Sequence, residues 1–331
     1  MTTRIGVVAI GRNEGDRLRA CLESARRDCE AVVYVDSGSS DDSVAMARSL
    51  GAEVVDLDLS IPFTAARARN AGFERLCREW PDLAYVQFVD GDCELEAGWI
   101  GAAAEVLDAD GWAVVCGRRR ERHPEASIYN RLCDMEWDTP IGPAAACGGD
   151  AMMRVDVLQQ VGGFSEDLIA GEEPELCVRI AEAGGRILRM DAPMTIHDAQ
   201  LLSLSQWWQR GKRAGHAEAE GAERHPEAND RRNARDVRSA WIWGGLLPAT
   251  ALVPAPFTSG LSLLLLLVWP LQILRIGLRR PRPNFSLGEN LLFGLDCVAG
   301  KAAHLAGVLR YLRGRATGRR SRLIEYKGGA R

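Results

Sequence analysis

Short apolar runs alternate with amphipathic segments along the first third of the chain. Five runs have the length and unbroken apolar character of buried strands: Ile5–Ile10, Ala31–Val35, Glu53–Leu57, Ala84–Val89 and Ala113–Cys116. Apolar residues at helical spacing lie between them, which predicts helices at Glu14–Arg26, Asp41–Leu50 and Thr64–Glu79. This alternation predicts an α/β domain with a mostly parallel sheet and helices on both faces. Ligands of such sheets bind beyond the carboxyl ends of the strands.

The expected helices carry end signals. Ser39 and Ser40 stand before Asp41–Leu50, where N-cap residues are expected, and Gly51 follows it. Pro174 suits the first position of a short helix over Pro174–Ala183, because no backbone donor is needed there. Gly184 then suits the end of that helix.

Beyond residue 200 the pattern becomes helical and then strongly apolar. Ser203–Glu220 predicts an amphipathic helix, residues 222–238 are polar, and Phe257–Leu274 is a run of 18 residues without charge. We therefore expect three regions: an α/β domain at residues 1–222, a polar linker at 223–239, and a hydrophobic hairpin with a basic, amphipathic tail at 240–331. Within that tail, Leu291–Leu312 predicts one more amphipathic helix.

The charge distribution favours a membrane-associated tail. Residues 275–331 hold 13 Lys and Arg against 3 Asp and Glu, although the whole chain has 41 against 45. A basic segment of this kind favours an anionic surface, and the apolar run before it favours a membrane over nucleic acid. Basic residues flank the apolar region on both sides: Arg231, Arg232, Arg235 and Arg238 before it, and Arg279, Arg280 and Arg282 after it. The positive-inside rule places both flanks in the cytoplasm.

A re-entrant or interfacial hairpin satisfies this placement, whereas a single span does not. The alternative is a helical pair buried against the α/β domain. The nine Cys include no C-x-x-C pair, which argues against a disulfide framework or a zinc site and favours a reducing compartment. The first apolar run is too short for a signal peptide. The expected location is the cytoplasmic face of the inner or plasma membrane.

Two acids close a buried strand in Val89-Asp90-Gly91-Asp92. Gly91 permits a sharp turn, so the carboxylates of Asp90 and Asp92 can converge on one cation. Hard cations such as Mg²⁺ or Mn²⁺ take oxygen ligands and often keep positions for substrate phosphates. The alternative is a solvated acidic loop, but the position directly after an apolar strand favours a divalent metal site.

Acidic residues also occur at two other positions where they could take part in binding or catalysis. Asp36 follows the second strand and could accept hydrogen bonds from a nucleobase or ribose, with pure turn chemistry as the alternative. Glu172 and Glu173 lie before Pro174 at a predicted helix N-terminus, whose positive end keeps a carboxylate ionised. An ionised carboxylate beside a hydroxyl can act as a general base. A simple N-terminal helix acid is the alternative there.

In their order and spacing these segments resemble the family 2 glycosyltransferases with the GT-A fold, from about Ile5 to His197. The matching segments are Arg12-Asn13-Glu14, the Asp36 segment, Ala68-Arg69-Asn70-Ala71-Gly72, Asp90-Gly91-Asp92, and Gly162-Gly163-Phe164 followed by Gly171-Glu172-Glu173. The resemblance implies transfer of a sugar from a nucleotide diphosphate donor, dependent on Mn²⁺ or Mg²⁺. The apolar hairpin adds the expectation of a lipid-linked or cell-envelope saccharide acceptor.

The resemblance also implies roles for individual residues. Asp36 would hold the nucleoside, Asp90 would lie near the ribose and the metal, and Asp92 would ligate the metal. Glu173 matches the catalytic base, with Glu172 beside it. The family usually carries Asp at the base position, so Glu173 is one methylene longer than expected.

Further contacts are implied on the donor and acceptor sides. The remaining nucleotide-sugar contacts would come from Asn13, Glu14, Arg69, Asn70 and Gly91, and the acceptor side from Gly148, Gly149, Asp150, Trp207 and Trp208. Arg67 is an alternative to Arg69 at the diphosphate. His197 matches a metal ligand of some relatives; a histidine satisfied at a strand end is the alternative.

The implied reaction is a single displacement. Glu173 accepts the proton of the acceptor hydroxyl, which attacks the anomeric carbon from the face opposite the nucleotide and inverts it. Charge on the leaving diphosphate is neutralised by the metal. Gln206-Trp207-Trp208-Gln209-Arg210 stands where processive members carry Q-x-x-R-W but lacks that Arg and Trp, which favours single additions. The Trp pair is also suited to a membrane interface.

Other functions remain as alternatives at this stage. A sugar nucleotidyltransferase also uses a nucleotide-binding α/β sheet and a metal, but no glycine-rich phosphate loop precedes the first helix. A non-catalytic GT-A scaffold is disfavoured by the intact acids. A dehydrogenase is disfavoured because no G-x-G-x-x-G follows the first strand.

Overall fold

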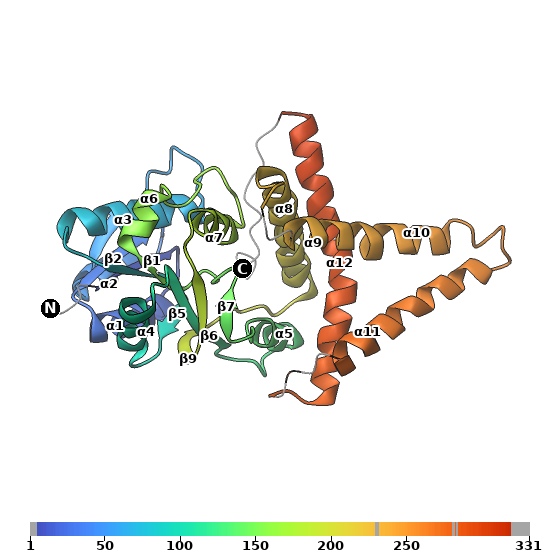
Figure 1. Cartoon of the computed structure of the whole chain (residues 1–331), viewed down its shortest axis with the longest axis horizontal. Helices are drawn as coiled ribbons and strands as arrows, with labels where there is room; N and C mark the ends of the chain where they lie inside the picture. Colours follow the sequence, from blue (N-terminus) through green and yellow to red (C-terminus); the bar gives the residue numbers. More distant parts are fainter. Residues whose placement is uncertain (1–4, 229–231, 280–281, 283, 319–331) are drawn as a thin grey trace. The chain divides into compact units, whose positions relative to one another are not determined.

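The strand–helix alternation of the sequence is present in the computed structural model of the chain (Figure 1). The structure describes residues 5–228, 232–279, 282 and 284–318, so Arg231, Arg280 and the basic residues within 319–331 lie outside the described part. The chain divides into two units. Unit 1 comprises Met1–Arg122 and Trp137–Ala199, and unit 2 comprises His123–Glu136 and Gln200–Arg331.

Unit 1 is built on a single mixed sheet. Its described strands are β1 (Ile5–Gly11), β2 (Ala31–Asp36), β3 (Glu53–Asp56), β4 (Tyr85–Asp90), β5 (Cys93–Leu95), β6 (Val114–Glu121), β7 (Gly142–Ala144), β8 (Ala151–Arg154) and β9 (Ile187–His197). Their order is β3-β2-β1-β4-β8-β6-β9-β5, and β7 pairs with β9. The first four strands are parallel, as expected, whereas β8 runs antiparallel to both β4 and β6.

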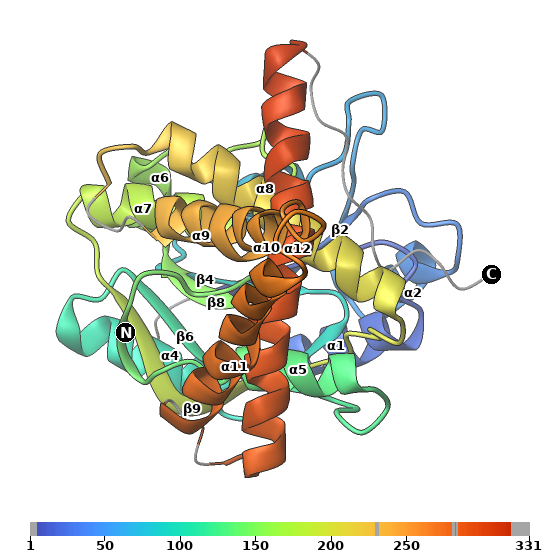
Figure 2. The same ribbon diagram turned by 90° about the vertical axis from the view of Figure 1, so that its right-hand side faces the viewer.

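Helices cover both faces of this sheet. They are α1 (Asp16–Asp28), α2 (Ser43–Ser49), α3 (Ala65–Glu79), α4 (Trp99–Asp110), α6 (Val155–Gln160) and α7 (Glu172–Glu182). Helices α3 and α6 lie on one face, and α1 and α4 lie on the other (Figures 1 and 2). Because both faces are covered, β1 and β2 are almost wholly buried and carry no charged residue except Asp36 at the end of β2.

The helix α3 lies unusually close to the sheet because glycine permits it. A Cβ atom on Gly72 would lie 2.4 Å from Cγ1 of Val8 on β1. The side chain of Thr64 caps this helix by accepting a hydrogen bond from the backbone N–H of Arg67. Arg69, one turn before Gly72 on the same helix, pairs with Asp90 at the end of β4.

Two helix starts differ from the sequence-based expectation. The helix α2 begins at Ser43, with Asp42 before it, because Ser39 and Ser40 bond instead to Asp36 and Asn13. The helix α7 begins at Glu172 rather than Pro174, with Gly171 before it at a φ of 78°. Pro174 is tolerated as the third residue because the first turn of a helix leaves its N–H groups without an intrahelical partner.

Unit 2 is helical in its described part. It contains α5 (Ile128–Glu136), α8 (Leu204–Arg224), α9 (Arg232–Trp241), the π-helical turn η1 (Ile242–Leu246), α10 (Leu247–Leu252), the 3₁₀ segment η2 (Leu261–Leu267), α11 (Val268–Arg279) and α12 (Leu287–Ala316). The expected boundary at residue 222 differs from this division, because α8 packs along α12 and belongs to unit 2. The expected linker at 223–239 is helical from Arg232 onward.

The long helix α12 begins four residues earlier than expected. Ser286 accepts a hydrogen bond from the Glu289 N–H, and the Glu289 carboxylate accepts one from the Ser286 N–H. This capping box fixes the start of the helix at Leu287.

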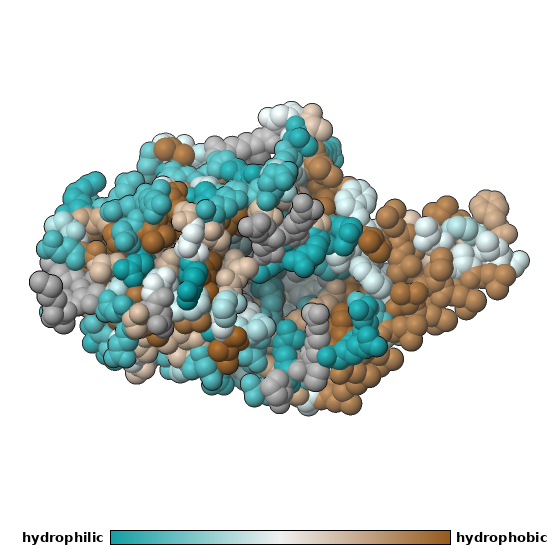
Figure 3. Space-filling view, in the orientation of Figure 1, coloured by the Kyte–Doolittle hydropathy of each residue, from teal (hydrophilic) through white to brown (hydrophobic). Residues whose placement is uncertain are grey.

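An apolar hairpin projects from α12 within unit 2 (Figures 1 and 2). The elements α9, η1 and α10 lead outward, and η2 and α11 return to α12. Apolar residues cover the returning arm of this hairpin, η2 and α11, and paler residues lie along the other arm (Figure 3); Phe257 near the tip is 88 % exposed. By length and composition, Leu261–Arg279 and Leu287–Ala316 are each able to cross a membrane, and only 6 % of the apolar window of the first is buried.

The crossing of α8 and α12 gives a stability prediction. A Cβ atom on Gly215 would lie 2.0 Å from the backbone oxygen of His304, so Gly215→Ala must push the two helices apart. Overpacking of this kind costs about 1–3 kcal/mol, and we expect a clear fall in the midpoint of thermal unfolding. Gly300→Ala on α12 is the control, because its Cβ would meet Trp207 at an ordinary 3.7 Å. Equal melting of both variants and the parent would contradict this packing.

Candidate active site

The Asp90-Gly91-Asp92 turn lies where the sequence predicts it, at the carboxyl end of β4. The Gly91 N–H donates to the Ile10 carbonyl of β1 at 2.8 Å, and a Cβ on Gly91 would come within 3.0 Å of that oxygen. The turn is therefore pressed against the end of β1, which only glycine allows without a shift. Asp90 remains partly exposed, whereas Asp92 is 3 % exposed.

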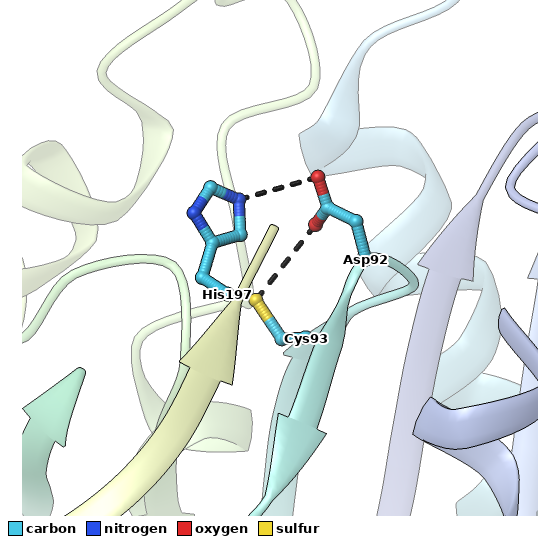
Figure 4. A group of neighbouring side chains, drawn as sticks. All are labelled: Asp92, Cys93 and His197. Atoms are coloured by element: carbon cyan, nitrogen blue, oxygen red, sulfur yellow. Dashed lines mark hydrogen bonds and ion pairs between the residues drawn. The ribbon is translucent and has the colours of Figure 1, made fainter. Parts of the chain in front are cut away.

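His197 lies beside Asp92 because β5 pairs with β9. Cys93 at the start of β5 stands opposite His197 at the end of β9, which brings His197 Nε2 to 3.2 Å from Asp92 Oδ2 (Figure 4). The Cys93 thiol lies 3.7 Å from the other carboxylate oxygen. The Trp137 ring meets the His197 ring edge-on at 4.8 Å. A carboxylate and an imidazole so placed are a suitable start for a divalent metal site.

Arg69 connects this turn to the first residue of α7. Its Nη2 donates to Asp90 Oδ1 at 2.8 Å, and its Nη1 donates to Glu172 Oε1 at 2.6 Å. Burial alone lowers the pKa of Arg69, but the two carboxylates outweigh it and raise that pKa above its usual value. The guanidinium is therefore a permanent cation that holds Asp90 and Glu172 in one cluster.

Removal of this cation should destabilise unit 1. In Arg69→Met the carboxylates of Asp90 and Glu172 would lose their shared counter-charge in a largely buried place. Breaking a buried ion pair from one side typically costs about 3–5 kcal/mol, which we expect to see by chemical unfolding. The exposed Arg48, which pairs with Asp56 at 3.3 Å, offers the control Arg48→Met with an expected change of less than about 1 kcal/mol.

Asp150, expected on the acceptor side, is buried in the structure. It is 0 % exposed and accepts hydrogen bonds from the Asp90 N–H and the Thr195 hydroxyl. Arg119 of β6 lies 2.7 Å from its second oxygen. Asp150 therefore holds the backbone of the Asp90 turn, because antiparallel β8 brings Asp150 beside the end of β4.

Of the two glycines before Asp150, Gly149 borders the cluster and Gly148 does not. A Cβ on Gly149 would lie 3.0 Å from Asp90 Oδ2 and 3.1 Å from Arg69 Nη2, whereas one on Gly148 would meet nothing within 4 Å. Gly148 has a φ of 82°, which favours glycine. Gly149 thus borders Asp90, and its missing side chain leaves room beside that carboxylate.

Glu173 is held by a backbone amide and two thiols. Its Oε1 accepts hydrogen bonds from the Cys147 N–H at 2.6 Å, from the Cys147 thiol at 3.1 Å and from the Cys177 thiol at 3.0 Å. The mutual hydrogen bond and burial raise the pKa of Cys147 well above its usual value. The contact with Cys147 lowers the pKa of Cys177, but burial outweighs it and raises that pKa to about 11. Both thiols therefore stay protonated and can donate.

The residues expected to contact the nucleoside, Asp36 and Asn13, lie at the ends of β2 and β1. Both oxygens of Asp36 accept hydrogen bonds from its own turn, from the Gly38 and Ser39 N–H groups and from the Tyr34 and Ser39 hydroxyls. Turn chemistry therefore accounts for Asp36 as the structure stands. Asn13, at a φ of 55°, joins the same turn by accepting from the Ser40 N–H at 2.7 Å.

Glu14 and Asn70 make different kinds of contact. Glu14 pairs with Arg17 at 2.7 Å and lies against Gly91. Asn70 donates to the Phe164 carbonyl and accepts from the Phe164 N–H, at 2.8 and 2.9 Å. Both ends of the amide therefore hold the Gly-Gly-Phe segment, and the nucleotide-sugar contact expected of Asn70 stays a prediction. Arg67 likewise holds a loop, donating to the carbonyls of residues 58, 61 and 62.

Trp207 and Trp208, expected on the acceptor side, belong to unit 2. The Trp207 indole N–H donates to Asp296 of α12 at 2.6 Å, which anchors α8 on α12. Trp208 is partly exposed. Arg210 pairs with Glu136 of α5 at 2.7 Å.

Three residues of the cluster were not found from the sequence. Arg119 follows an apolar strand within Arg118-Arg119-Arg120, and a charge run that continues a buried strand is a usable signal for an inward charge. Cys147 and Cys177 carry no signal, because 30 positions separate them and no motif joins them. Only the fold brings them to Glu173.

Comparison with known proteins adds independent findings. Residues 7–162 match the family model described as Glycosyl transferase family 2. The chain is similar to Glycosyltransferase AglE of Haloferax volcanii, 25 % identical over 193 residues, which cover 54 % of this chain and 62 % of the relative. It is 27 % identical to the Pre-mycofactocin glycosyltransferase of Mycobacterium tuberculosis over 241 residues, or 67 % of this chain and 48 % of the relative. The matches span less than two thirds of either relative.

A solved structure extends the likeness to the fold. The mannosyltransferase PcManGT from Pyrobaculum calidifontis, in complex with GDP-Man and Mn²⁺, aligns with a TM-score of 0.56 at 18 % identity. The alignment covers 94 % of this chain and 88 % of that one. The predicted GT-A architecture is thereby confirmed.

Proposed function

We propose that this chain, whose residues 7–162 match the model of the family 2 glycosyltransferases, transfers a sugar from a nucleotide diphosphate donor, with inversion, to a lipid-linked or cell-envelope saccharide. The observation that carries this proposal is the Arg69 bridge. It ties Asp90, at the end of β4, to Glu172, at the start of α7. The turn that carries the proposed metal ligand Asp92 and the helix start that carries the proposed base Glu173 are therefore joined through the neighbouring acids Asp90 and Glu172.

The chemistry of the donor set fits a divalent cation. Asp92 and His197 would hold it, with Asp90 beside the ribose and diphosphate. Oxygen and imidazole ligands suit Mn²⁺, and the related PcManGT was solved with that ion. When bound, such an ion neutralises the negative charge that develops on a leaving diphosphate. The pairing of β5 with β9, which brings His197 to 3.2 Å from Asp92, supports this assignment.

Glu173 is the proposed general base. Three donors hold its Oε1, so its second oxygen is oriented by a fixed carboxylate plane. In the reaction, the acceptor hydroxyl gives its proton to Glu173 while its oxygen forms the bond to the anomeric carbon, and the bond to the diphosphate breaks. The Cys147 N–H and the two thiols stabilise the negative charge on Glu173 before transfer. The extra methylene of Glu over Asp lets the carboxylate reach these donors.

The test is a donor screen with product analysis. The purified chain is incubated with Mn²⁺, an acceptor lipid extract and a panel of uridine, guanosine and thymidine diphosphate sugars. The expected result is release of a nucleoside diphosphate and a product of inverted anomeric configuration by NMR. Release of pyrophosphate would instead favour a nucleotidyltransferase. No turnover and no nucleotide-induced rise in melting temperature would remove the proposal.

The hairpin is proposed to insert into the cytoplasmic leaflet of a membrane. Its exposed apolar surface has no cover within the described part of unit 2, and exposed arginines stand at both ends: Arg235 and Arg238 on α9, and Arg275 and Arg279 on α11. Arginines at the base of an apolar hairpin suit anionic headgroups on the side from which it enters. This placement would bring the enzyme to a lipid-linked acceptor.

Vesicle flotation tests the hairpin. Leu264→Asp places a charge on a 60 % exposed apolar position of η2. Since burying a leucine contributes about 1.5–3 kcal/mol, we expect binding to phosphatidylglycerol vesicles to weaken by at least tenfold. Ile141→Asp, at an equally exposed site of unit 1, should leave flotation unchanged. Equal loss in both variants, or none in Leu264→Asp, would count against insertion.

A further inference from the structure

Two thiols and a carboxylate form a second cluster beside the base. Sγ of Cys147, Sγ of Cys177 and a carboxylate oxygen of Glu173 all lie within 4.8 Å of one another, and all three residues are buried. Cys147 lies in the loop that leads to Gly148 and Gly149, and Cys177 lies one turn after Glu173 on α7. The i, i+4 spacing puts Glu173 and Cys177 on one face of that helix.

The distances match those of a tetrahedral thiolate site. Zinc–sulfur bonds of about 2.3 Å at a tetrahedral angle place two sulfurs about 3.8 Å apart. The Cys147 and Cys177 sulfurs lie 3.7 Å apart. A zinc-bound oxygen would lie about 3.5 Å from each sulfur, so Glu173 Oε1, now at 3.1 and 3.0 Å, needs to withdraw by about half an ångström.

The cluster differs in chemical type from the Asp92 site. Asp92, Cys93 and His197 offer one thiol among harder ligands, whereas this second cluster offers two thiols and one carboxylate. Soft thiolate ligands select Zn²⁺ and Cd²⁺ over Mn²⁺ or Mg²⁺. The two sites would therefore select different cations: the Asp92 site would take a hard ion, and the Glu173 cluster would take a thiophilic ion.

We propose that Cys147, Cys177 and Glu173 bind a thiophilic divalent cation such as Zn²⁺, and that its binding withdraws Glu173 from the acceptor. Each thiol gives its proton to solvent as its sulfur bonds the metal, so two protons are released per ion and no oxidant is required. The Glu173 carboxylate then serves as a ligand and no longer as a base. The inhibitory consequence rests on the proposed function; the metal binding does not.

The binding test uses Cd²⁺ as an optical probe on the full chain in detergent with Mn²⁺ present. Thiolate–cadmium charge transfer absorbs in the ultraviolet, and we expect one equivalent of Cd²⁺ to give an absorbance equal to two thiolates. Cys147→Ser and Cys177→Ser should each at least halve it, and Cys77→Ser on α3 should leave it unchanged. Circular dichroism and nucleotide-induced thermal shifts verify that each variant is folded. No absorbance in the parent chain, or full absorbance in the Cys147→Ser/Cys177→Ser double variant, would overturn the site.

A second arm separates this proposal from the proposed function. Zn²⁺ at saturating Mn²⁺ should lower sugar transfer by at least tenfold in the parent chain, reversibly on chelation. The ratio of rates with and without Zn²⁺ should return towards one in Cys177→Ser. An unchanged rate in the parent at a Zn²⁺ level that displaces Cd²⁺ would overturn the inhibitory role. If the Cd²⁺ absorbance appears but the chain transfers no sugar from any donor, the proposed function is wrong and the metal site remains supported.

Discussion

Asp92→Asn should reduce sugar transfer by about 10³-fold, the effect of losing roughly 4 kcal/mol of stabilisation at the leaving diphosphate. The substitution keeps the size of the side chain and its contact with His197, so unit 1 should fold as before. What it removes is the negative charge that would hold the cation. The expected signature is a fall in kcat together with a loss of Mn²⁺ binding, followed by the EPR signal of free Mn²⁺ in a titration.

A matched control lies on the strand that carries His197. Asp191 of β9 is exposed and distant in sequence from the turn, so Asp191→Asn should retain parental activity and Mn²⁺ binding. His197→Ala should weaken Mn²⁺ binding in the same direction as Asp92→Asn, because both belong to one pair at 3.2 Å. Full, metal-independent transfer by Asp92→Asn would show that the Asp90-Gly91-Asp92 turn has another purpose.

Glu173→Gln should lower kcat by about 10²–10⁴-fold, the usual contribution of a general base. The amide oxygen of Gln can still accept the hydrogen bond of the Cys147 N–H, so the loop should keep its position. Donor affinity, measured by nucleotide-sugar titration, should change little because the role proposed for Glu173 is a contact with the acceptor. A loss confined to kcat is the pattern of an interaction made in the transition state.

Two further variants make this result specific. Glu182→Gln, at the exposed end of α7, should behave as the parent. Glu172→Gln breaks the 2.6 Å ion pair with Arg69 and should therefore lower the melting temperature, which Glu173→Gln should not. If Glu173→Gln keeps its kcat while Glu172→Gln loses it without any loss of stability, the base is Glu172 and the roles proposed for the pair are reversed.

The folding pattern was largely readable from the sequence because it depends on local periodicity. The runs at β1, β2 and β4 are buried on both faces and so carry no alternation to misread. Leu18, Cys21, Leu22 and Ala25 line the buried side of α1 as their spacing predicts. The position of the Asp90 turn could be predicted in the same way, because a polar triplet that directly follows an apolar strand is expected at the end of that strand.

Errors arose where side chains had a choice of partner. Ser39 and Ser40 were expected to cap α2, but Asp36 and Asn13 offered acceptors across the loop and the helix began later. Asn70, in a matching motif, and Asp150, expected on the acceptor side, both bond to backbone groups, which the sequence did not indicate. A match to a motif identifies a residue of interest but does not show which atoms its side chain contacts.

The sequence by itself determined the class of this protein: the α/β order, the position of the acids at strand ends and the apolar hairpin. These follow from patterns that span fewer than about 20 residues, over which neighbouring positions share one element. Only the tertiary structure decided that Arg69 joins Asp90 to Glu172, that β9 brings His197 to Asp92, and that Cys147 and Cys177 enclose Glu173. Apart from the contact of Cys177 with Glu173 within one helix, such contacts join positions 21 to 105 residues apart, and their geometry depends on how strands pair and helices pack, which no local pattern encodes.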